Sequence, residues 1–248
     1  MSHSLEIREG AFVVADAHCS YKRPDFLEFL KDISAKKLSP TQLILMGDIF
    51  DALFGEIPYT HKKNQEAIKI LNKISFDIEV IYLEGNHDFN LKSIFPNIKV
   101  FPISLQPVAC RFENKKVLLA HGDIESDFGY KIYTTIIRNF AVLYFLRIVD
   151  FLSGHYILKR LDLYLGKKDD CKEFTGLDKF MSQRLDGKYS CDYFVEGHFH
   201  QNKMIQLKNF TYINLGAFVC NQRYFIVKSD GDRGFLQENL FKMDLEYE

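Results

Sequence analysis

Five short clusters of aspartate, histidine and asparagine occur along the chain, each directly after a short apolar run. These side chains offer carboxylate, amide-oxygen and imidazole ligands, and no cluster contains a cysteine thiolate. Glycines in most of the clusters let the backbone approach closely. The clusters are Asp16-Ala17-His18, Gly47-Asp48-Ile49-Phe50-Asp51, Gly85-Asn86-His87-Asp88, His121-Gly122-Asp123 and Gly197-His198-Phe199-His200.

Taken singly, most of these clusters are typical of turns. Gly-Asp-x-x-Asp often caps a helix, and Gly-Asn-His-Asp suits a tight turn because Asn and Gly tolerate positive φ. Asp88 can cap such a turn or orient His87. Gly-His-x-His favours a metal, since its two imidazoles lie on one side of an extended segment. Chance turns do not collect so many ligands, so together the clusters predict a metal site at one sheet edge.

The ligand types suit borderline or hard divalent ions. Carboxylate, amide and imidazole ligands indicate Mn²⁺, Fe²⁺, Zn²⁺ or Mg²⁺. There are enough ligands for two ions, in which case one carboxylate must bridge them. Two ions about 3.5–4 Å apart can activate a water molecule near neutral pH and hold the oxygens of a phosphoryl centre during in-line displacement.

The apolar runs before the clusters predict the elements that position them. Each run is too short for a helix and lacks a 3.6-residue period, which favours buried strands. Amphipathic stretches at Pro24–Lys37 and His61–Ile74 predict helices between the early strands. We therefore expect an α/β or α+β fold, a sandwich of two mixed sheets flanked by helices. The predicted strands are Phe12–Ala15, Leu43–Met46, Val80–Leu83, Val117–Ala120, Tyr193–Val195 and Thr211–Leu215.

Residues 128–188 differ from the rest of the chain. Ile132–Leu165 is helical by length and content, with a break at Ser153-Gly154 and a polar turn at Gly166–Asp170. Apolar side chains at nearly every helical phase exceed what one buried stripe requires, although part of them can cover the main core. We predict one domain over residues 1–248, with an apolar helical insertion at about 128–188.

Composition excludes several classes of protein. The 248 residues are 47% hydrophobic and 26% charged with a net charge of −1, which excludes wholesale disorder and binding of nucleic acid by bulk charge. Five scattered cysteines favour reduced thiols over a disulfide framework. The chain starts without an apolar signal segment and has no long apolar run, so we expect a soluble, cytoplasmic protein. The 23 Phe and 13 Tyr are an aromatic excess.

The ordered clusters resemble the signature of the calcineurin-like metallophosphoesterases: D-x-H, GD, GNH[DE], a histidine after a strand, and GHxH. The resemblance runs from residue 16 to residue 200. It implies that Asp48 bridges two metal ions and that His87 stabilises the phosphoryl transition state and assists the leaving group. It also implies a first ion held by Asp16, His18 and His200 and a second held by Asn86, His121 and His198.

A narrower resemblance is to the UDP-2,3-diacylglucosamine pyrophosphatases of lipid A synthesis. The segments that carry it are 44–56, 85–91, 121–123, 127–130 and 215–218. That family has an apolar helical insertion that receives acyl chains, at the position of residues 128–188. The resemblance implies water attack on the α-phosphorus of the UDP-sugar, which gives UMP and a diacylglucosamine 1-phosphate (lipid X). It also implies that Asp127 and Tyr130 contact the sugar phosphate, where a helix N-cap and a core aromatic are the structural alternatives.

One departure bears on the substrate. The lipid A enzymes commonly have Arg where this chain has His87, which is the residue of the wider superfamily. A soluble nucleotide or phosphoester substrate is therefore the alternative, and an apolar groove leading to the metals would favour acyl chains. A non-catalytic scaffold with the same fold ranks last, because all seven ligands and His87 are present.

The insertion also suggests contact with a membrane. Its apolar residues lie near basic residues that could meet an anionic leaflet, although a solvated charged face explains the same charges. We expect a cytoplasmic enzyme with peripheral contact to the inner membrane and no nucleic-acid partner. The basic residues are Lys159, Arg160, Lys167 and Lys168.

Overall fold

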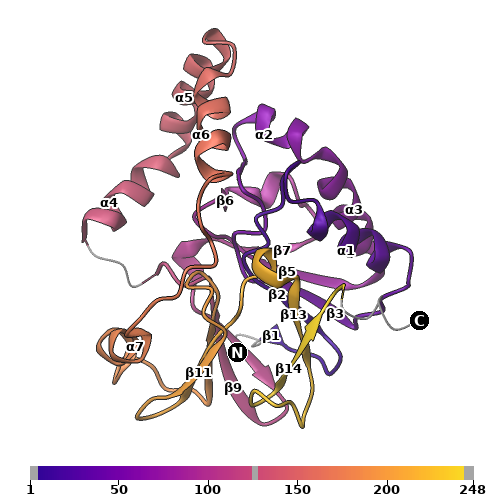
Figure 1. Cartoon of the computed structure of the whole chain (residues 1–248), viewed down its shortest axis with the longest axis vertical. Helices are drawn as coiled ribbons and strands as arrows, with labels where there is room; N and C mark the ends of the chain where they lie inside the picture. Colours follow the sequence, from indigo (N-terminus) through magenta and orange to yellow (C-terminus); the bar gives the residue numbers. More distant parts are fainter. Residues whose placement is uncertain (1–4, 125–127, 243–248) are drawn as a thin grey trace.

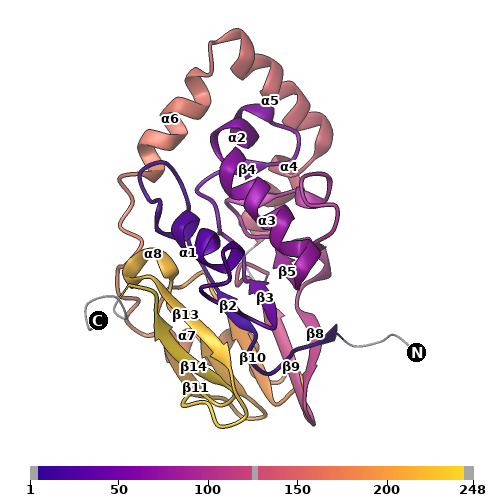
Figure 2. The ribbon, with the colours of Figure 1, turned by 90° about the vertical axis from the view of Figure 1, so that its right-hand side faces the viewer.

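Two six-stranded sheets form the body of the molecule and helices cover their outer faces (Figures 1 and 2). The computed structural model describes residues 5–124 and 128–242. A layer of apolar side chains from both sheets fills the space between them. The predicted fold class, a two-sheet mixed sandwich flanked by helices, is confirmed.

Each sheet mixes parallel and antiparallel strands. The first sheet has, in spatial order, β1 (Leu5–Glu6), β8 (Val108–Phe112), β9 (Lys115–Ala120), β10 (Tyr193–Glu196), β12 (Thr211–Asn214) and β11 (Lys203–Gln206). The second has β14 (Leu236–Leu240), β13 (Arg223–Val227), β2 (Phe12–Val14), β3 (Gln42–Leu45), β5 (Glu79–Leu83) and β7 (Lys99–Phe101). A separate pair joins β4 (Leu53–Phe54) to β6 (Asp88–Phe89).

Helices lie on both sides of the sandwich. The second sheet is covered by α1 and α3, and the first by α7 (Figure 1). The helices are α1 (Asp25–Ser34), α2 (Pro58–Lys63), α3 (Gln65–Asp77), α4 (Phe128–Ile137), α5 (Phe140–Leu152), α6 (Tyr156–Leu165), α7 (Leu177–Leu185) and α8 (Phe218–Asn221), with 3₁₀ turns at Leu91–Ser93 and Ile103–Leu105.

The alternation of side chains along the strands separates the apolar layers. In β2, Val13 packs between the sheets, whereas Phe12 and Val14 pack against the layer of α1 and α3. This follows from the two-residue period of a strand. Both faces of the sheets are buried, which is why their strands appear in the sequence as continuous apolar runs.

The predicted insertion divides into two parts. Helices α4, α5 and α6 extend beyond the sandwich (Figures 1 and 2), and the predicted break at Ser153-Gly154 falls between α5 and α6. By contrast, α7 packs Met181 and Leu185 against the outer face of the first sheet. Among the described residues no single helix could span a membrane; α5 and α6 together meet the length and composition but bend by 101° at their break.

The prediction of reduced thiols is wrong for two of the five cysteines. Cys171 and Cys220 form a disulfide whose Cα atoms are 5.7 Å apart. The remaining three, Cys19, Cys110 and Cys191, are free. A separation of 49 residues leaves no local sequence signal for the pair, because only the folded chain brings the segment after α6 onto α8.

Candidate metal centre

The predicted ligands come from two sheets, not from one sheet edge as the sequence analysis expected. Asp16, Asp48 and Asn86 follow β2, β3 and β5, which are parallel strands of the second sheet. His121 and the Gly-His-x-His cluster follow β9 and β10, which are parallel strands of the first. The carboxyl ends of these two sets of strands meet where the sheets face each other. The ligands therefore gather at the junction of the two sheets, and each sheet supplies part of them.

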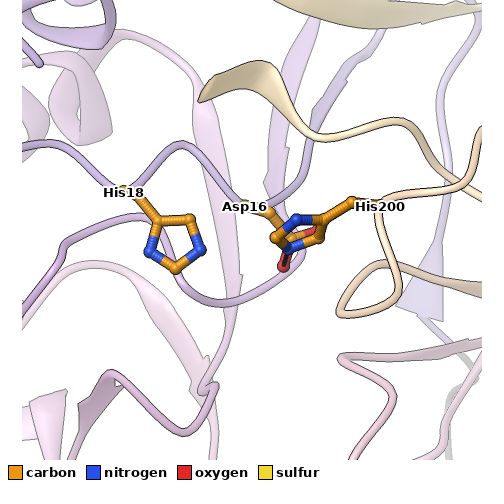
Figure 3. A group of neighbouring side chains, drawn as sticks. All are labelled: Asp16, His18 and His200. Carbon is orange, nitrogen blue, oxygen red and sulfur yellow. Dashed lines mark ion pairs between the residues drawn. The ribbon is translucent and has the colours of Figure 1, made fainter. Parts of the chain in front are cut away.

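One group of ligands consists of Asp16, His18 and His200 (Figure 3). The Nε2 atom of His200 lies 3.2 Å from Oδ1 of Asp16. The His18 and His200 rings have centroids 5.6 Å apart and meet at 65°. The Nε2 of His18 is buried without a hydrogen-bond partner in the described part of the chain. A buried imidazole nitrogen without a partner beside a carboxylate is the environment that a divalent cation would satisfy.

A second group consists of Asp48, His121 and His198, with Asn86 beside them. The Nε2 atom of His121 lies 3.4 Å from Oδ2 of Asp48, 3.2 Å from Nδ1 of His198 and 3.3 Å from Oδ1 of Asn86. Three potential ligand atoms thus converge on one ring nitrogen. The structure therefore brings all seven predicted ligands close together, with Asp48, the bridge that the resemblance implies, in the second group.

The second nitrogen of two histidine rings is fixed by a backbone carbonyl. Nδ1 of His121 donates to Met46 O at 3.0 Å, and Nδ1 of His200 donates to Asp170 O. Such bonds set the tautomer and leave Nε2 free for a metal. In both residues Nε2 is the atom that faces the carboxylate of its group.

His87 lies beside the ligands without belonging to either group. Its Nδ1 donates to Asp51 O at 2.9 Å, and its Nε2 is 4.0 Å from Oδ2 of Asp48. Its ring stands edge-on to His18 with centroids 4.9 Å apart. The ring lines a cavity of about 310 Å³. His87 is therefore oriented to act on a molecule in that cavity.

Charges within the site shift the pKa values of its groups in opposite directions. Burial opposes ionisation of Asp48, but the charges of His121 and His87 outweigh it and hold the pKa of Asp48 well below its usual value. Burial also opposes protonation of His121, yet Asp48 raises the pKa of His121 well above its usual value. Burial and the charge of His121 lower the pKa of His198 to about 4. Asp16 has a lowered pKa, because His200 outweighs the effect of burial.

The backbone at the ligands adopts conformations that side chains rarely favour. Asp16, His18, Asp48, His198 and His200 all have φ between 45° and 60°. Left-handed backbone at non-glycine residues costs free energy and tends to collect at functional sites. Five of the seven predicted ligands share this feature, which the packing of the two sheets has to maintain.

Sequence reasoning left the role of Asp88 open between a turn cap and a partner of His87. The carboxylate accepts hydrogen bonds from the backbone N–H groups of Asp48, Ile49, Phe50 and Gly85 and from the Tyr82 hydroxyl. Burial and the charge of Asp48 raise the pKa of Asp88 to about 7. Asp88 thus joins the two clusters that carry Asp48 and Asn86, and the β4–β6 pair reinforces that junction.

Three further residues support the site and were missed from the sequence. Nδ2 of Asn214 donates to the carbonyl of Gly197 at 2.6 Å, which holds the Gly-His-x-His turn. Arg138 lies over the Phe89 ring and donates to Gly85 O at 2.8 Å. Asp170 reaches His200 from the segment after α6. No motif marks these residues; for Asn214, the polar end of a predicted strand was the one available signal.

The two predicted sugar-phosphate contacts remain untested. Asp127 lies outside the described residues, and the structure describes Tyr130 only by its place in α4. Neither the predicted contacts nor their structural alternatives can be compared with a side-chain position.

The donor set fits a pair of divalent cations. Each group offers one carboxylate and two imidazoles whose ligand atoms lie within 4.8 Å of one another. Asp48 belongs to the second of these groups. Carboxylate and imidazole groups at the joined ends of two mixed sheets define a metal-dependent hydrolase.

The comparison with known families agrees with this class. A family model described as "Calcineurin-like phosphoesterase" matches residues 11–202. This chain belongs to the calcineurin-like phosphoesterases, whose members hydrolyse phosphoesters or phosphoanhydrides at a dinuclear metal site.

Curated relatives are similar at low identity. A UDP-2,3-diacylglucosamine hydrolase of Histophilus somni is 24% identical over 89% of this chain and 97% of that protein. One of Blochmanniella pennsylvanica is 28% identical over 52% of this chain, and the match spans about half (53%) of that relative's length. The solved Yfce phosphoesterase from E. coli aligns over 93% of this chain and 98% of its own, with 14% identity and a TM-score of 0.48.

Proposed function

We propose that this chain hydrolyses the pyrophosphate bond of UDP-2,3-diacylglucosamine, giving UMP and 2,3-diacylglucosamine 1-phosphate. The relatives of Histophilus somni and Blochmanniella pennsylvanica carry the name of this activity. The sequence resemblance points the same way. The structural observation that carries the proposal is the cavity next to His87.

The cavity beside the ligands is lined by both polar and apolar side chains. Its polar lining includes Asn86 and His87, together with the charged residues Asp51, Arg138 and Lys168. Helices α4 and α6 supply Ile137, Leu161 and Leu165 to its apolar lining, and β4 and β6 supply Phe54 and Phe89. Such a site suits a phosphate linked to acyl chains, because burial of apolar surface favours their binding by about 25 cal/mol per Å².

A second cavity, whose lining residues differ from those of the first, lies against the projecting helices. It measures about 830 Å³ and lies between α2 and α5, with Tyr59, Ile148 and Phe151 among its lining residues. A cluster of apolar side chains that includes Phe54, Leu143 and Leu158 packs between these helices and the sandwich. The projecting helices therefore offer apolar surface for acyl chains in addition to the cavity at His87.

The residues of the site would divide the work of the reaction. When bound, the two cations would lower the pKa of water and neutralise charge on the phosphoryl oxygens. The hydrogen bond from Nδ1 of His87 to Asp51 O leaves Nε2 directed at the site, where the ring would donate to the departing oxygen. Asp127 and Tyr130 would contact the sugar phosphate.

The ligands would be distributed as the sequence resemblance implies, with Mn²⁺ as the proposed cation and Fe²⁺, Zn²⁺ or Mg²⁺ as alternatives. Asp48 would bridge, as the resemblance implies; its carboxylate lies with His121 and His198 in the second group. The first cation would be held by Asp16, His18 and His200, and the second by Asn86, His121 and His198.

Incubation with UDP-2,3-diacylglucosamine and Mn²⁺ tests the proposal directly, with UMP as the expected product. Ile137→Asn should raise KM for the long-chain substrate by about tenfold, as expected when ~1.4 kcal/mol of apolar contact is lost. Ile136, its exposed neighbour on α4, supplies the matched control Ile136→Asn. Absence of UMP, or equal KM values for the two variants, would contradict the lipid substrate.

His87 itself supports a second candidate, a phosphodiesterase acting on a soluble substrate. Histidine at this position is typical of the wider superfamily. Hydrolysis of bis(p-nitrophenyl) phosphate, but not of the UDP-glycolipid, would favour this candidate. Both substrates should be assayed on one preparation so that metal content is the same.

We also propose that the enzyme works in the cytoplasm, in peripheral contact with the inner membrane. Large apolar side chains on α5 and α6 are exposed, among them Phe140, Phe145 and Phe151 at 65–69%. Lys159 and Arg160 on α6 add positive charge. Co-sedimentation with vesicles containing anionic lipid, weakened by salt, would support the contact; equal recovery without vesicles would oppose it.

A further inference from the structure

The segment between α6 and α7 returns from the projecting helices to the Asp16–His18–His200 group. Asp170 lies on this segment, and its side chain is 3% exposed. The Asp170 carbonyl accepts a hydrogen bond from Nδ1 of His200. The orientation of one predicted ligand thus depends on a residue that the ligand motifs do not include.

The carboxylate of the same residue is linked to the other histidine by a chain of three contacts. Oδ2 of Asp170 lies 2.6 Å from Nη1 of Arg23. That nitrogen lies 3.4 Å from Oδ1 of Asp51, and Oδ1 of Asp51 lies 3.4 Å from Nδ1 of His18. The Asp170 carbonyl therefore holds the outer nitrogen of His200 by a hydrogen bond, whereas its carboxylate is linked to His18 only by ion pairs through Arg23 and Asp51.

A covalent bond holds this segment in place. Cys171, next to Asp170, is bonded to Cys220 on α8. The first residues of α8 donate backbone hydrogen bonds to the strand end that carries Asp16: Phe218 N to Ala15 O at 2.9 Å and Val219 N to Asp16 O at 3.2 Å. The disulfide thus links the segment that orients His200 to the helix that packs against Asp16.

We propose that Asp170 is a positioning residue for the Asp16–His18–His200 group and that the Cys171–Cys220 pair controls it by redox state. In the disulfide form the segment is fixed and both histidines are oriented. In the dithiol form no covalent bond holds the segment that carries Asp170. The Asp16–His18–His200 group then binds a divalent cation more weakly. The inference rests on the proposed metal role of the three ligands and is independent of the substrate.

The redox step is an ordinary thiol–disulfide exchange with a small-molecule disulfide such as oxidised glutathione. One protein thiolate attacks a sulfur of the oxidant, forming a mixed disulfide and releasing one glutathione thiolate. The second protein thiolate then attacks the mixed disulfide and releases the other glutathione. Two electrons pass to the oxidant, and two protons leave the protein. Cys171 is exposed, so the pair is accessible to such reagents.

The test compares Mn²⁺ binding by the oxidised and the reduced full-length protein. Both forms are stripped of metal, their thiols are counted under denaturing conditions, and Mn²⁺ is titrated by electron paramagnetic resonance of the free ion. We expect three thiols in the oxidised form and five in the reduced form. Affinity at one of the two sites should fall by about tenfold on reduction, as is usual when an outer contact of a ligand is lost. The other site is the internal control for folding.

Single-residue variants separate the effect of the Cys171–Cys220 disulfide from that of nearby residues. Cys220→Ser should have the lower affinity in both redox conditions, whereas Cys191→Ser, which alters a free cysteine, should respond as the natural chain does. Asp170→Asn should weaken the same site with the disulfide intact, and exposed Asp178 on α7 provides the control Asp178→Asn. Equal Mn²⁺ affinity in the three-thiol and five-thiol forms would overturn the proposal, as would five thiols in the oxidised preparation. Because Mn²⁺ is the only probe, failure to hydrolyse the UDP-glycolipid would leave this result standing.

Discussion

At the scale of single residues, the second nitrogen of each imidazole distinguishes the roles of the histidines. His121 and His200 direct Nε2 toward a carboxylate because Nδ1 is held by a carbonyl. His87 is held in the same way by Asp51 O, but its Nε2 stands 4.0 Å from Asp48 at the edge of a cavity. The first two are therefore suited to bind a metal, and the third to transfer a proton.

Replacing His87 tests this distinction. His87→Ala should lower kcat by about 10²–10⁴-fold, the usual contribution of one positioned acid–base group. Metal content should stay the same, since the ring belongs to neither ligand group. Metal analysis of the variant beside its kinetics checks both statements. A parallel loss of metal and rate would make His87 a ligand.

The pH dependence of metal binding follows from His121. Asp48 overcomes the effect of burial and raises the pKa of His121 well above its usual value, which favours the protonated ring in the metal-free protein. A metal must displace that proton, and its affinity therefore falls as the pH is lowered. Mn²⁺ titrations from pH 8 to pH 6 should show progressively weaker binding with proton release. Affinity that is constant over this range would contradict the assignment of His121 as a ligand.

At the scale of elements, the turns after the strands have little room for side chains. The turn after β10 places Gly197 so close to Asp16 that an added Cβ would lie 2.4 Å from Oδ2 of Asp16. Asn214 holds the same turn through the Gly197 carbonyl. The glycine is required here by the approach of two sheets, because the carboxylate comes from β2 and the turn from β10.

Gly197→Ala should therefore displace the Asp16 carboxylate and weaken metal binding by about tenfold or more, as for other disturbances of a ligand's surroundings. Gly129→Ala on α4 is the control, since an added Cβ there would meet nothing within 4 Å. Mn²⁺ affinity and thermal unfolding of both variants provide the comparison. An unchanged affinity in Gly197→Ala would show that Asp16 is not a ligand.

At the scale of the whole molecule, the site joins the two halves of the sandwich. Ligands from the second sheet face ligands from the first, so that buried carboxylates and imidazoles lie close together. A bound cation would stabilise the folded chain by neutralising these carboxylates and by linking the sheets. Ligand binding to the native state raises stability in proportion to RT ln(1 + [L]/Kd).

Removal of metal should accordingly lower stability as well as activity. EDTA should abolish turnover and Mn²⁺ restore it. At 100 times Kd, Mn²⁺ should add about 2.7 kcal/mol to the free energy of unfolding. For a domain of this size each kcal/mol corresponds to roughly 2–4 °C in Tm. Calorimetry with and without EDTA measures the shift, and an enzyme whose Tm and rate ignore chelation would contradict the metal centre.

Sequence patterns alone were sufficient for the six strands that precede ligand clusters or the Leu215 turn (β2, β3, β5, β9, β10 and β12), for the order of the clusters and for the two-sheet fold, but not for the other eight strands that the structure describes. These features are local, because a strand that is buried on both faces is a continuous apolar run, and the polar residues of the next turn follow it directly in the sequence. The break between α5 and α6 was also visible, since Ser153-Gly154 interrupts an apolar helix. Local periodicity therefore determined what each segment is.

Tertiary structure alone decided which segments meet. The sequence placed the ligands on one sheet edge, whereas they come from the joined ends of two sheets. The predicted insertion at residues 128–188 includes α7, whereas in the structure α7 packs on the first sheet. The sequence also contains no sign that Asp170 orients His200 or that Cys171 bonds Cys220. These contacts depend on how distant segments pack, and the free energy of that packing belongs to the whole fold and not to any stretch of residues.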